Sequence, residues 1–323
     1  MKRVYIDQCH WIRLESAAYG NSTDPRSVEA LDLLRYGVDK GLVSVPISAA
    51  HYMETYQRPR SRQRLAALMA ELSRFHAIAG PPDVLPAELD TYLHKRYRKP
   101  TEPRPLRVFG RGVAFALGAD LPSFRIRDAL PRPPGERARF ERVAGDVLEF
   151  WMLSGPPDDV PIPGWDENRG CREFGERQLA HEQALRQALV KEGPATPKKV
   201  HDFVAATELL DIREPLNEAL EYAGITNADS PNLDTAEGLT ALLRALPSRD
   251  VIFDLRRLRH ADGEARWEAN DLNDLGALSV ALPYCDVVVT EKQWRHLACQ
   301  AGIPERYGTI VLDNLGSLPQ HLL

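Results

Sequence analysis

The sequence predicts an α/β protein with a doubly wound, mostly parallel sheet and a large, mainly helical insertion. Two short apolar runs, VYI close to the N-terminus and VVV close to the C-terminus, are rich in β-branched and aromatic residues, as buried strands are. Helical patterns follow both runs, and alternating strands and helices favour right-handed crossovers and a parallel sheet. The middle of the chain is rich in proline and in helical patterns, which indicates an insertion between the two halves of the sheet.

Composition sets broad limits on the protein class. The chain has 323 residues, of which 43% are apolar, enough for a sizeable core. A net charge of −5 argues against coating nucleic acid by bulk electrostatics, although local binding remains open. No apolar run approaches the roughly 20 residues that span a bilayer, and the N-terminal apolar run is too short for a signal peptide. We therefore expect a cytoplasmic protein that does not enter the membrane.

The N-terminal part contains two predicted strands. Residues 3–7 form the first strand, which ends in Asp7. Apolar residues at near-helical spacing predict a helix over residues 28–40, and Gly41 is well placed to end it. The next apolar run predicts a second buried strand over residues 43–48.

A proline within this second run weakens the strand prediction. Pro46 lacks the amide donor that a central strand needs. Ser48 can cap the helix that follows, over residues 49–57, and this helix carries Glu54 about two turns in. A further helical stretch, residues 58–76, completes the N-terminal part.

Many prolines divide the region up to about residue 165 into short pieces. The clearest amphipathic helix within it covers residues 136–153, and two more helices are predicted over 175–192 and 200–223. The predicted organisation is an N-terminal part of the α/β core, a helical insertion and a C-terminal part of the core, over residues 1–76, 77–240 and 241–323.

The C-terminal part gives the clearest pattern. Asn270 or Asp271 can cap a helix that Pro283 stops. A continuous β-branched run follows, as expected for a parallel strand covered on both faces. The remaining elements are this strand, a helix and a final strand, over residues 285–290, 292–301 and 309–314.

Acidic residues occur where these elements join. Ligands bind outside the carboxyl ends of the strands in an open parallel sheet. Asp7 ends its strand, Asp274 lies at the start of a helix and Glu291 follows a strand, so all three can face one crevice. Asp286 precedes that strand and is expected roughly 13 Å away, at the opposite edge. Gathered carboxylates hold hard divalent cations, which predicts a metal-dependent hydrolase of phosphodiesters.

The same residues resemble the motif of the PIN-like nucleases. Members of that family carry an Asp at the end of the first strand and a Ser six positions before a Glu. They also carry an Asp that opens a later helix and a strand ending in Thr. These positions resemble Asp7, Ser48 with Glu54, Asp274, and Thr290.

The resemblance covers roughly residues 1–75 and 250–315 and includes one departure. The last acidic position of the family usually falls two residues after the Thr, where this chain has Lys292. Glu291 lies one residue earlier. Either Glu291 reaches the metal, or the site has three carboxylates, which can still hold one Mg²⁺ or Mn²⁺ completed by water.

The resemblance implies hydrolysis of RNA, less often DNA, with Mg²⁺ or Mn²⁺ orienting a water and lowering its pKa. Such proteins often act as toxins or in defence, so the resemblance also implies a cytoplasmic inhibitor partner. Oligomeric state is left open. The implied metal ligands are Asp7, Glu54, Asp274 and Glu291, with Asp271 as an auxiliary residue and Thr290 as a hydrogen-bond donor.

Each acidic residue also has a simpler interpretation. Asp271 and Asp274 can be first-turn acids that stabilise the helix dipole by a few tenths to about 1 kcal/mol. Glu54 alone is most simply a solvated helical residue. Asp7 is harder to explain in this way, because a carboxylate at the end of a buried strand needs a partner or a metal.

A basic, aromatic stretch in the insertion is a second candidate for function. It can be a nucleic-acid groove, since phosphates attract cations and exposed bases stack on aromatic rings, or an ordinary solvated face. Its candidate nucleic-acid-binding residues are Lys95, Arg96, Arg98, Lys99, Arg107 and Arg111.

Two alternatives to a nuclease remain. The first is a PIN-like domain that has lost catalysis and serves as a nucleic-acid-binding or regulatory module, which Lys292 favours. The second is another doubly wound phosphatase or hydrolase. The sequence contains no Gly-rich phosphate loop and no nucleophile elbow, which argues against the second alternative.

Overall fold

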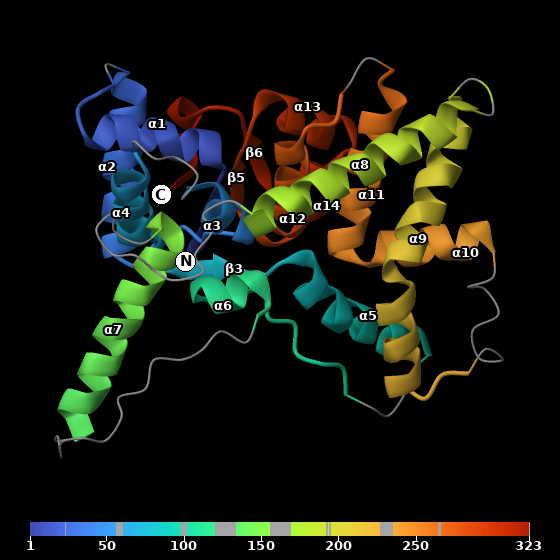
Figure 1. Ribbon diagram of the computed structural model, residues 1–323, viewed down its shortest axis with the longest axis horizontal. Coiled ribbons are helices and arrows are strands. Elements are labelled where there is room, and N and C mark those ends of the chain that lie inside the picture. Colours follow the sequence, from blue (N-terminus) through green and yellow to red (C-terminus); the bar gives the residue numbers. More distant parts are fainter. Residues whose placement is uncertain are drawn as a thin grey trace.

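A small parallel sheet surrounded by many helices forms the protein, as Figure 1 shows. The α/β class predicted from the sequence is confirmed at this level, with more helix and a smaller sheet than expected. The computed structural model describes residues 1–22, 24–55, 61–97, 102–119, 134–155, 169–191, 193, 195–226, 235–263 and 266–322.

The central sheet joins the two ends of the chain. Its strands lie in the order β2-β1-β5-β6, and all neighbours are parallel. Tyr5 is in register with Val288, which is in register with Val311. Lys2 Nζ donates to the His321 carbonyl at 2.7 Å, so the termini also lie together. The strands are β1 (Lys2–Ile6), β2 (Val43–Ser44), β5 (Val287–Val289) and β6 (Ile310–Leu312).

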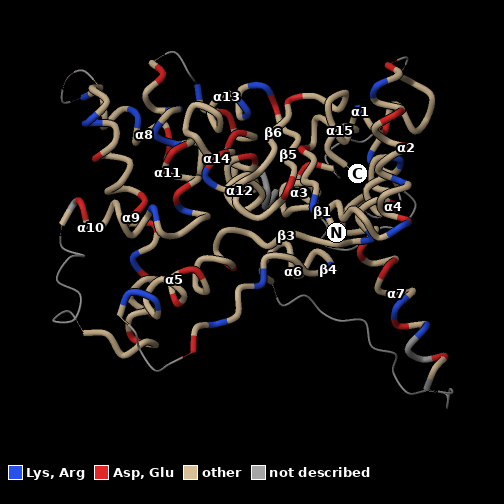
Figure 2. The backbone as a smooth tube through the Cα atoms, turned by 180° about the vertical axis from the view of Figure 1, so that it is seen from behind, with Lys and Arg blue, Asp and Glu red and all other residues tan. Residues whose placement is uncertain are grey.

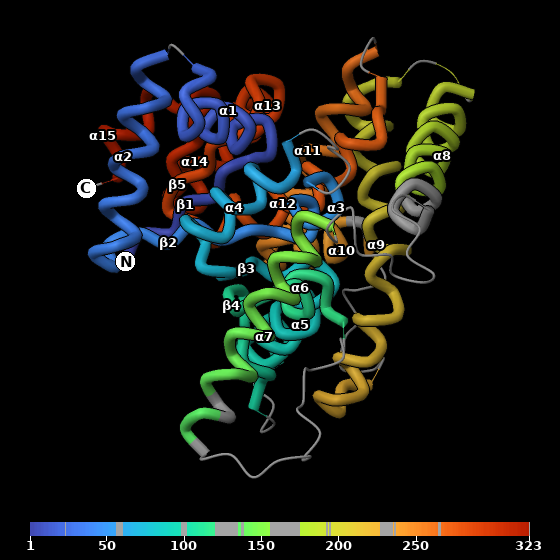
Figure 3. Tube along the Cα trace, turned by 60° about the vertical axis from the view of Figure 1, so that its left-hand side comes forward, coloured from blue at the N-terminus to red at the C-terminus, as the bar shows by residue number. Residues whose placement is uncertain are grey.

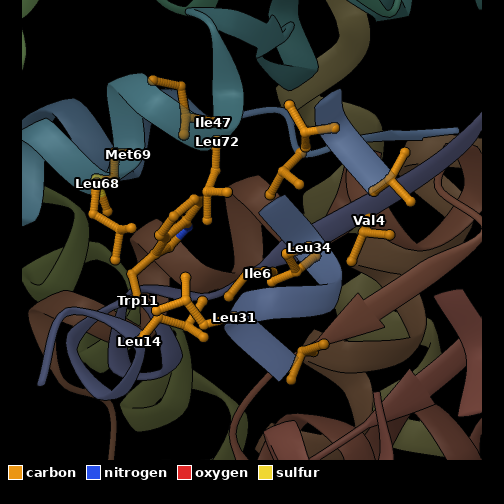
Figure 4. Close-up of a cluster of buried hydrophobic side chains, with 14 of the residues drawn as sticks. Val4, Ile6, Trp11, Leu14, Leu31, Leu34, Ile47, Leu68, Met69 and Leu72 are labelled. Carbon is orange, nitrogen blue, oxygen red and sulfur yellow. The ribbon is translucent and has the colours of Figure 1, made fainter. Parts of the chain in front are cut away.

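Helices cover both faces of the sheet. Alternate strand residues point to opposite faces, so Val4 and Ile6 belong to one core and Tyr5 to the other. Trp11 fills the first core, where Figure 4 shows it beside Leu14 and Leu31. The first core is covered by α1 (Gln8–Ala18), α2 (Pro25–Asp39) and α4 (Arg62–Ser73). The second is covered by α11 (Pro247–Ala261), α12 (Ala269–Tyr284), α13 (Lys292–Gln300) and α14 (Ile303–Tyr307).

A third core lies among helices away from the sheet. It joins α5, α9 and α10 to Phe253 of α11. In Figures 1 and 3, α9 borders this part of the molecule and α7 projects from the opposite side. The remaining helices are α3 (Ala49–Thr55), α5 (Pro81–Tyr97), α6 (Gly112–Leu117), α7 (Pro134–Ser154), α8 (Arg169–Lys191), α9 (Pro197–Tyr222), α10 (Ala236–Ala245), a 3-10 turn η3 (Leu315–Ser317) and α15 (Pro319–Leu322).

The structure corrects the prediction at the second strand. Only Val43 and Ser44 pair with β1, and the run then turns away at Pro46. Ile47 instead forms an isolated parallel bridge with Ala77 of β3 (His76–Ile78), a strand that pairs antiparallel with β4 (Phe109–Arg111). A proline cannot donate to a ladder, which explains the short strand. The sequence analysis did not predict β3, β4 or α14.

Helix ends agree with the sequence at α2 and differ at α12. Gly41 has a φ of +68°, a left-handed conformation that favours glycine at the end of a helix. α12 begins at Ala269, because Glu268 forms a capping box with Asp271. Pro283 lies in the last turn of α12 and does not stop the helix before it.

Charges of both signs alternate along the outer helices. Figure 2 shows Lys and Arg interspersed with Asp and Glu along α7 and α8, so neither helix presents a surface of one sign. Across the described ranges, no helix is both long enough and apolar enough to span a bilayer.

Candidate functional site

Asp7 is fixed where β1 and β5 end side by side. Its amide donates to the Val289 carbonyl at 2.8 Å, which extends the pairing of the two strands. One carboxylate oxygen accepts the Gln8 amide at 2.8 Å and caps α1, and the other accepts the Thr290 hydroxyl at 2.9 Å. Asp7 is 5% exposed, so these bonds replace nearly all of its contact with water.

Asp274 lies beside Asp7 on the second turn of α12. The indole Nε1 of Trp294, a fully buried residue of α13, donates to its carboxylate at 3.0 Å. Burial, followed by the charges of Asp7 and Glu54, raises the pKa of Asp274 to about 9. Asp274 therefore carries a proton at neutral pH in the metal-free protein.

The pKa of Asp7 is raised less, to about 6. Burial is the main cause, and hydrogen bonds from Thr290, Gln8 and Asp274 oppose it. Since burial and then the charge of Asp7 raise the pKa of Asp274, a proton on Asp274 favours an ionised Asp7 beside it. We call these two residues the acidic pair.

Glu54 and Glu291 lie near the acidic pair but are held differently. Glu54, in the last turn of α3, accepts the side-chain amide of Asn273 at 3.1 Å, and its charge raises the pKa of Asp274. Glu291 is the exposed cap residue of α13, and its charge raises the pKa values of both members of the pair. The four predicted ligands thus gather at one edge of the sheet.

Lys292, at the position where the family motif carries an acid, belongs to a different environment. It is exposed, and its charge lowers the pKa of Asp313. Asp313 follows β6, the edge strand. Glu291 is therefore among the charges that raise the pKa values of the acidic pair.

The donor set matches the chemistry of a hard divalent cation, though only the pair is close together. Carboxylate oxygens suit Mg²⁺ and Mn²⁺, and Mg²⁺ is commonly held by one or two carboxylates with water completing its shell. Within the described ranges, no group of three or more His, Cys, Asp or Glu side chains converges closely enough to hold a metal. Asp7 and Asp274 would be the direct ligands, and Glu54 and Glu291 would act through charge or water.

Asp271 is not part of this group, although the sequence analysis assigned it an auxiliary role. One of its oxygens accepts from Arg259 and from the Glu268 amide, and the other accepts from Gln293 at 3.2 Å. Both oxygens are thus occupied by bonds that join α11, α12 and α13. Asp271 is a structural ion-pair partner at the start of α12.

Asp286 lies away from the acidic pair, as strand geometry predicted. It precedes β5, and its carboxylate accepts the Arg3 amide at 2.7 Å. This bond joins the amino-terminal ends of β1 and β5, opposite the ends that carry the pair.

A buried histidine connects the start of α3 to the end of β1. The Ser48 amide donates to His51 Nδ1 at 2.9 Å, so the ring proton lies on Nε2, which donates to the Ile6 carbonyl at 2.9 Å. Burial lowers the pKa of His51 to about 4, and the ring stays neutral. The Ser48 hydroxyl bonds the ring and lies 3.3 Å from the Tyr5 hydroxyl. This network positions the helix that carries Glu54.

The structure does not bring the basic stretch to the acidic pair. In Figures 1 and 3, α5 and β4 lie at the end of the molecule opposite α1 and α13. Lys95 and Arg96 are exposed in the last turn of α5, and Arg107 is exposed in the loop that follows. Arg111 forms an ion pair with Asp146 at 2.5 Å. Two other candidates, Arg98 and Lys99, lie outside the described residues.

Sequence reasoning missed two side chains that hold the site. Trp294 is one of them, since its indole donates to Asp274 from α13. Asn273 precedes Asp274, and its side-chain amide donates to Glu54. Their positions beside the acidic motif were visible in the sequence, but nothing local indicates that their side chains meet residues far away in the chain.

Comparison with known proteins adds no assignment, since no family model, curated protein or solved structure matches the chain. The functional argument therefore depends on the geometry and electrostatics of the site.

Proposed function

We propose that this protein is a metal-dependent phosphodiesterase, most simply a PIN-like ribonuclease. The observation that carries the proposal is the acidic pair, Asp7 and Asp274, at the carboxyl ends of parallel strands with both pKa values raised. Two buried carboxyl groups do not stabilise a fold as an ion pair would, and burial disfavours their charged forms. A divalent cation bound in place of the proton on Asp274 would offset that cost.

The surrounding side chains would orient the pair for this task. Thr290 and Gln8 hold the two oxygens of Asp7, and Trp294 holds one oxygen of Asp274. Glu54, placed by Asn273, would position the attacking water. A bound Mg²⁺ or Mn²⁺ would supply charge to neutralise the phosphate and lower the pKa of that water.

A cysteine nucleophile does not suit this site. Cys9 lies two residues after Asp7, and burial, with the Asp7 and Glu291 charges, raises its pKa to about 12. The thiol therefore stays protonated and weakly nucleophilic at neutral pH. Hydrolysis by an activated water fits the charge distribution better.

A catalytically degenerate binding module is the second candidate. It is favoured by the position of Lys292 and by the convergence of only two carboxylates in the described residues. Such a module would bind RNA without cleaving it. The experiment that follows separates the two functions.

The test is cleavage of RNA by the full chain with Mn²⁺ or Mg²⁺. We expect Asp7→Asn and Asp274→Asn each to lower the rate by about a hundredfold or more, since ion-dependent stabilisation amounts to several kcal/mol. Asp286→Asn is the matched control and should cleave like the parent, because it lies at the opposite strand ends. If Asp7→Asn cleaves RNA at the rate of the parent, the assignment of the site to Asp7 is wrong. RNA binding without cleavage by the parent would support the binding module.

A further inference from the structure

A cavity of about 930 Å³ adjoins the acidic site. Its walls come from α3, the start of α5, α8, α11 and α12, and Figure 1 shows α8 crossing α11 and α12. Asn273 lines the cavity and also donates to Glu54. The cavity therefore begins one side chain away from the acidic residues, and its volume falls within the range of small-molecule sites.

Much of the wall of the cavity is apolar. Met53, Ile252 and Leu272 line it, together with alanines and prolines. Two side-chain amides, Gln178 and Asn273, add donors and acceptors to this wall. A nucleobase has matching chemistry, since its faces are flat and apolar while its edge carries hydrogen-bonding groups.

The same cavity is also lined by carboxylates and arginines, and the arginines differ in how fully they are paired. Arg256 is buried and held by carboxylates that include Glu182 and Glu208. Arg249 bonds Glu208 at 3.3 Å, and its Nε has no acceptor among the described residues. Arg177 lines the same cavity and is exposed. Arg249 and Arg177 together suit an anionic group such as a phosphate.

We propose that this cavity is a nucleotide subsite, in which one nucleotide of the substrate lies with its base on the apolar wall. One flanking phosphate would face the Asn273 and Glu54 end, and the other would face Arg177 and Arg249. The inference rests on the proposed phosphodiester hydrolysis, because a nucleotide in a strand has a phosphate on each side and the cavity lining includes both Asn273, which donates to Glu54, and the arginines.

The test measures binding of 5′-nucleoside monophosphates to the full chain in EDTA, by calorimetry. Gly276 lines the cavity, and a Cβ added there meets no atom within 4 Å, so Gly276→Leu should fill space without a clash. We expect at least one nucleotide to bind at millimolar concentration and Gly276→Leu to weaken it about tenfold or more. Gly145→Leu in α7, where a Cβ also meets nothing, is the matched control and should bind like the parent.

A second variant tests the role of the arginines in the cavity lining. Arg177→Gln should weaken the monophosphate and leave the affinity for the uncharged nucleoside unchanged. Failure of all four nucleotides to bind, or equal binding by Gly276→Leu and the parent with both proteins folded, would overturn the subsite.

These outcomes are separable from the proposed function. Nucleotide binding that persists in Asp7→Asn and is lost in Gly276→Leu supports the cavity as a nucleotide site even where cleavage is absent. Cleavage that depends on Asp7 but is unaffected by Gly276→Leu keeps the function and removes the subsite. If the protein cleaves RNA and the monophosphate inhibits cleavage competitively, a nucleotide of the substrate occupies the cavity. Noncompetitive inhibition would indicate a free regulatory nucleotide in the cavity and would contradict the proposal.

Discussion

Thr290 connects the acidic pair to the sheet. Its hydroxyl donates to Asp7, is fully buried and lowers the pKa of that carboxyl. Thr290→Val should therefore raise the Asp7 pKa further, and protons should compete better with a cation. We expect the apparent Mn²⁺ affinity to fall several-fold at pH 6 and to recover by pH 8, together with a stability loss of about 1–3 kcal/mol. Calorimetric titration at both pH values measures this.

Thr309→Val is the control for the loss of a buried hydroxyl. Thr309 is also buried at the edge of the sheet, and its hydroxyl donates to the Leu282 carbonyl at 2.6 Å. This variant should lose stability and keep its Mn²⁺ affinity. An equal loss of affinity in both variants would show that Thr290 acts only through folding.

Glu291 is the residue that the family resemblance left unresolved. Its charge acts on both members of the acidic pair, whereas that of Lys292 acts on Asp313. At pH 9 we expect Glu291→Gln to lower the Mn²⁺ affinity by about five- to tenfold, as loss of a charge worth about 1 kcal/mol predicts. Lys292→Gln should change it by less than about twofold. The opposite order of effects would exclude Glu291 from the site.

At the scale of the elements, Arg259 holds α11 against α12 and α13. Its guanidinium bonds Asp271 and the Arg266 carbonyl, and it lies 5.3 and 5.5 Å from the ring centres of Trp267 and Trp294. Trp294 in turn donates to Asp274. The ion pair thus supports the acidic pair through packing, without contacting it.

Asp271→Asn separates support from ligation. Removing one partner leaves Arg259 buried with an uncompensated charge, which costs about 3–5 kcal/mol. Urea denaturation should show this loss, while the Mn²⁺ affinity of the folded variant should stay within about twofold of the parent. Unchanged stability with lost Mn²⁺ binding would make Asp271 a ligand.

The elements that local patterns specify were predictable. Apolar β-branched runs indicated β1, β5 and β6, and the prediction of Asp7 and Asp274 at element junctions needed only their positions. The family resemblance distinguished Asp274 from Asp271, but the ion pair of Asp271 could not be predicted, because Arg259 reaches it through tertiary packing. The cavity was equally hidden, since its walls come from segments far apart in the chain.

For the whole molecule, the raised carboxyl pKa values predict how stability changes with pH. A group whose pKa is higher in the folded state than in the unfolded state contributes its full stabilisation of the fold at pH values below the unfolded-state pKa. That contribution is lost as the pH rises through the folded-state pKa. His51 has the opposite sign, since its lowered pKa favours folding above its ordinary value of 6.5. Between pH 7 and 9 the His51 contribution is constant, and Asp274, with a pKa raised to about 9, dominates.

The metal-free protein should therefore lose stability from pH 7 to pH 9. Asp274→Asn should flatten this slope and raise the Tm at pH 9, by about 1.5 °C for each kcal/mol regained in a chain of this size. Thermal unfolding in EDTA measures both. A parallel fall in Asp274→Asn and the parent would assign the pH dependence to other groups.

Binding of a cation to the acidic pair must displace the proton that Asp274 carries at neutral pH, so proton release measures this binding most directly. Mn²⁺ titrations of the full chain at pH 7.5, in buffers with different ionisation enthalpies, count the protons released. We expect about one proton per Mn²⁺ for the parent and for Asp286→Asn, and no tight binding for Asp7→Asn or Asp274→Asn. Absence of binding by the parent at millimolar Mn²⁺, or binding that both Asn variants retain, would contradict a metal site at Asp7 and Asp274.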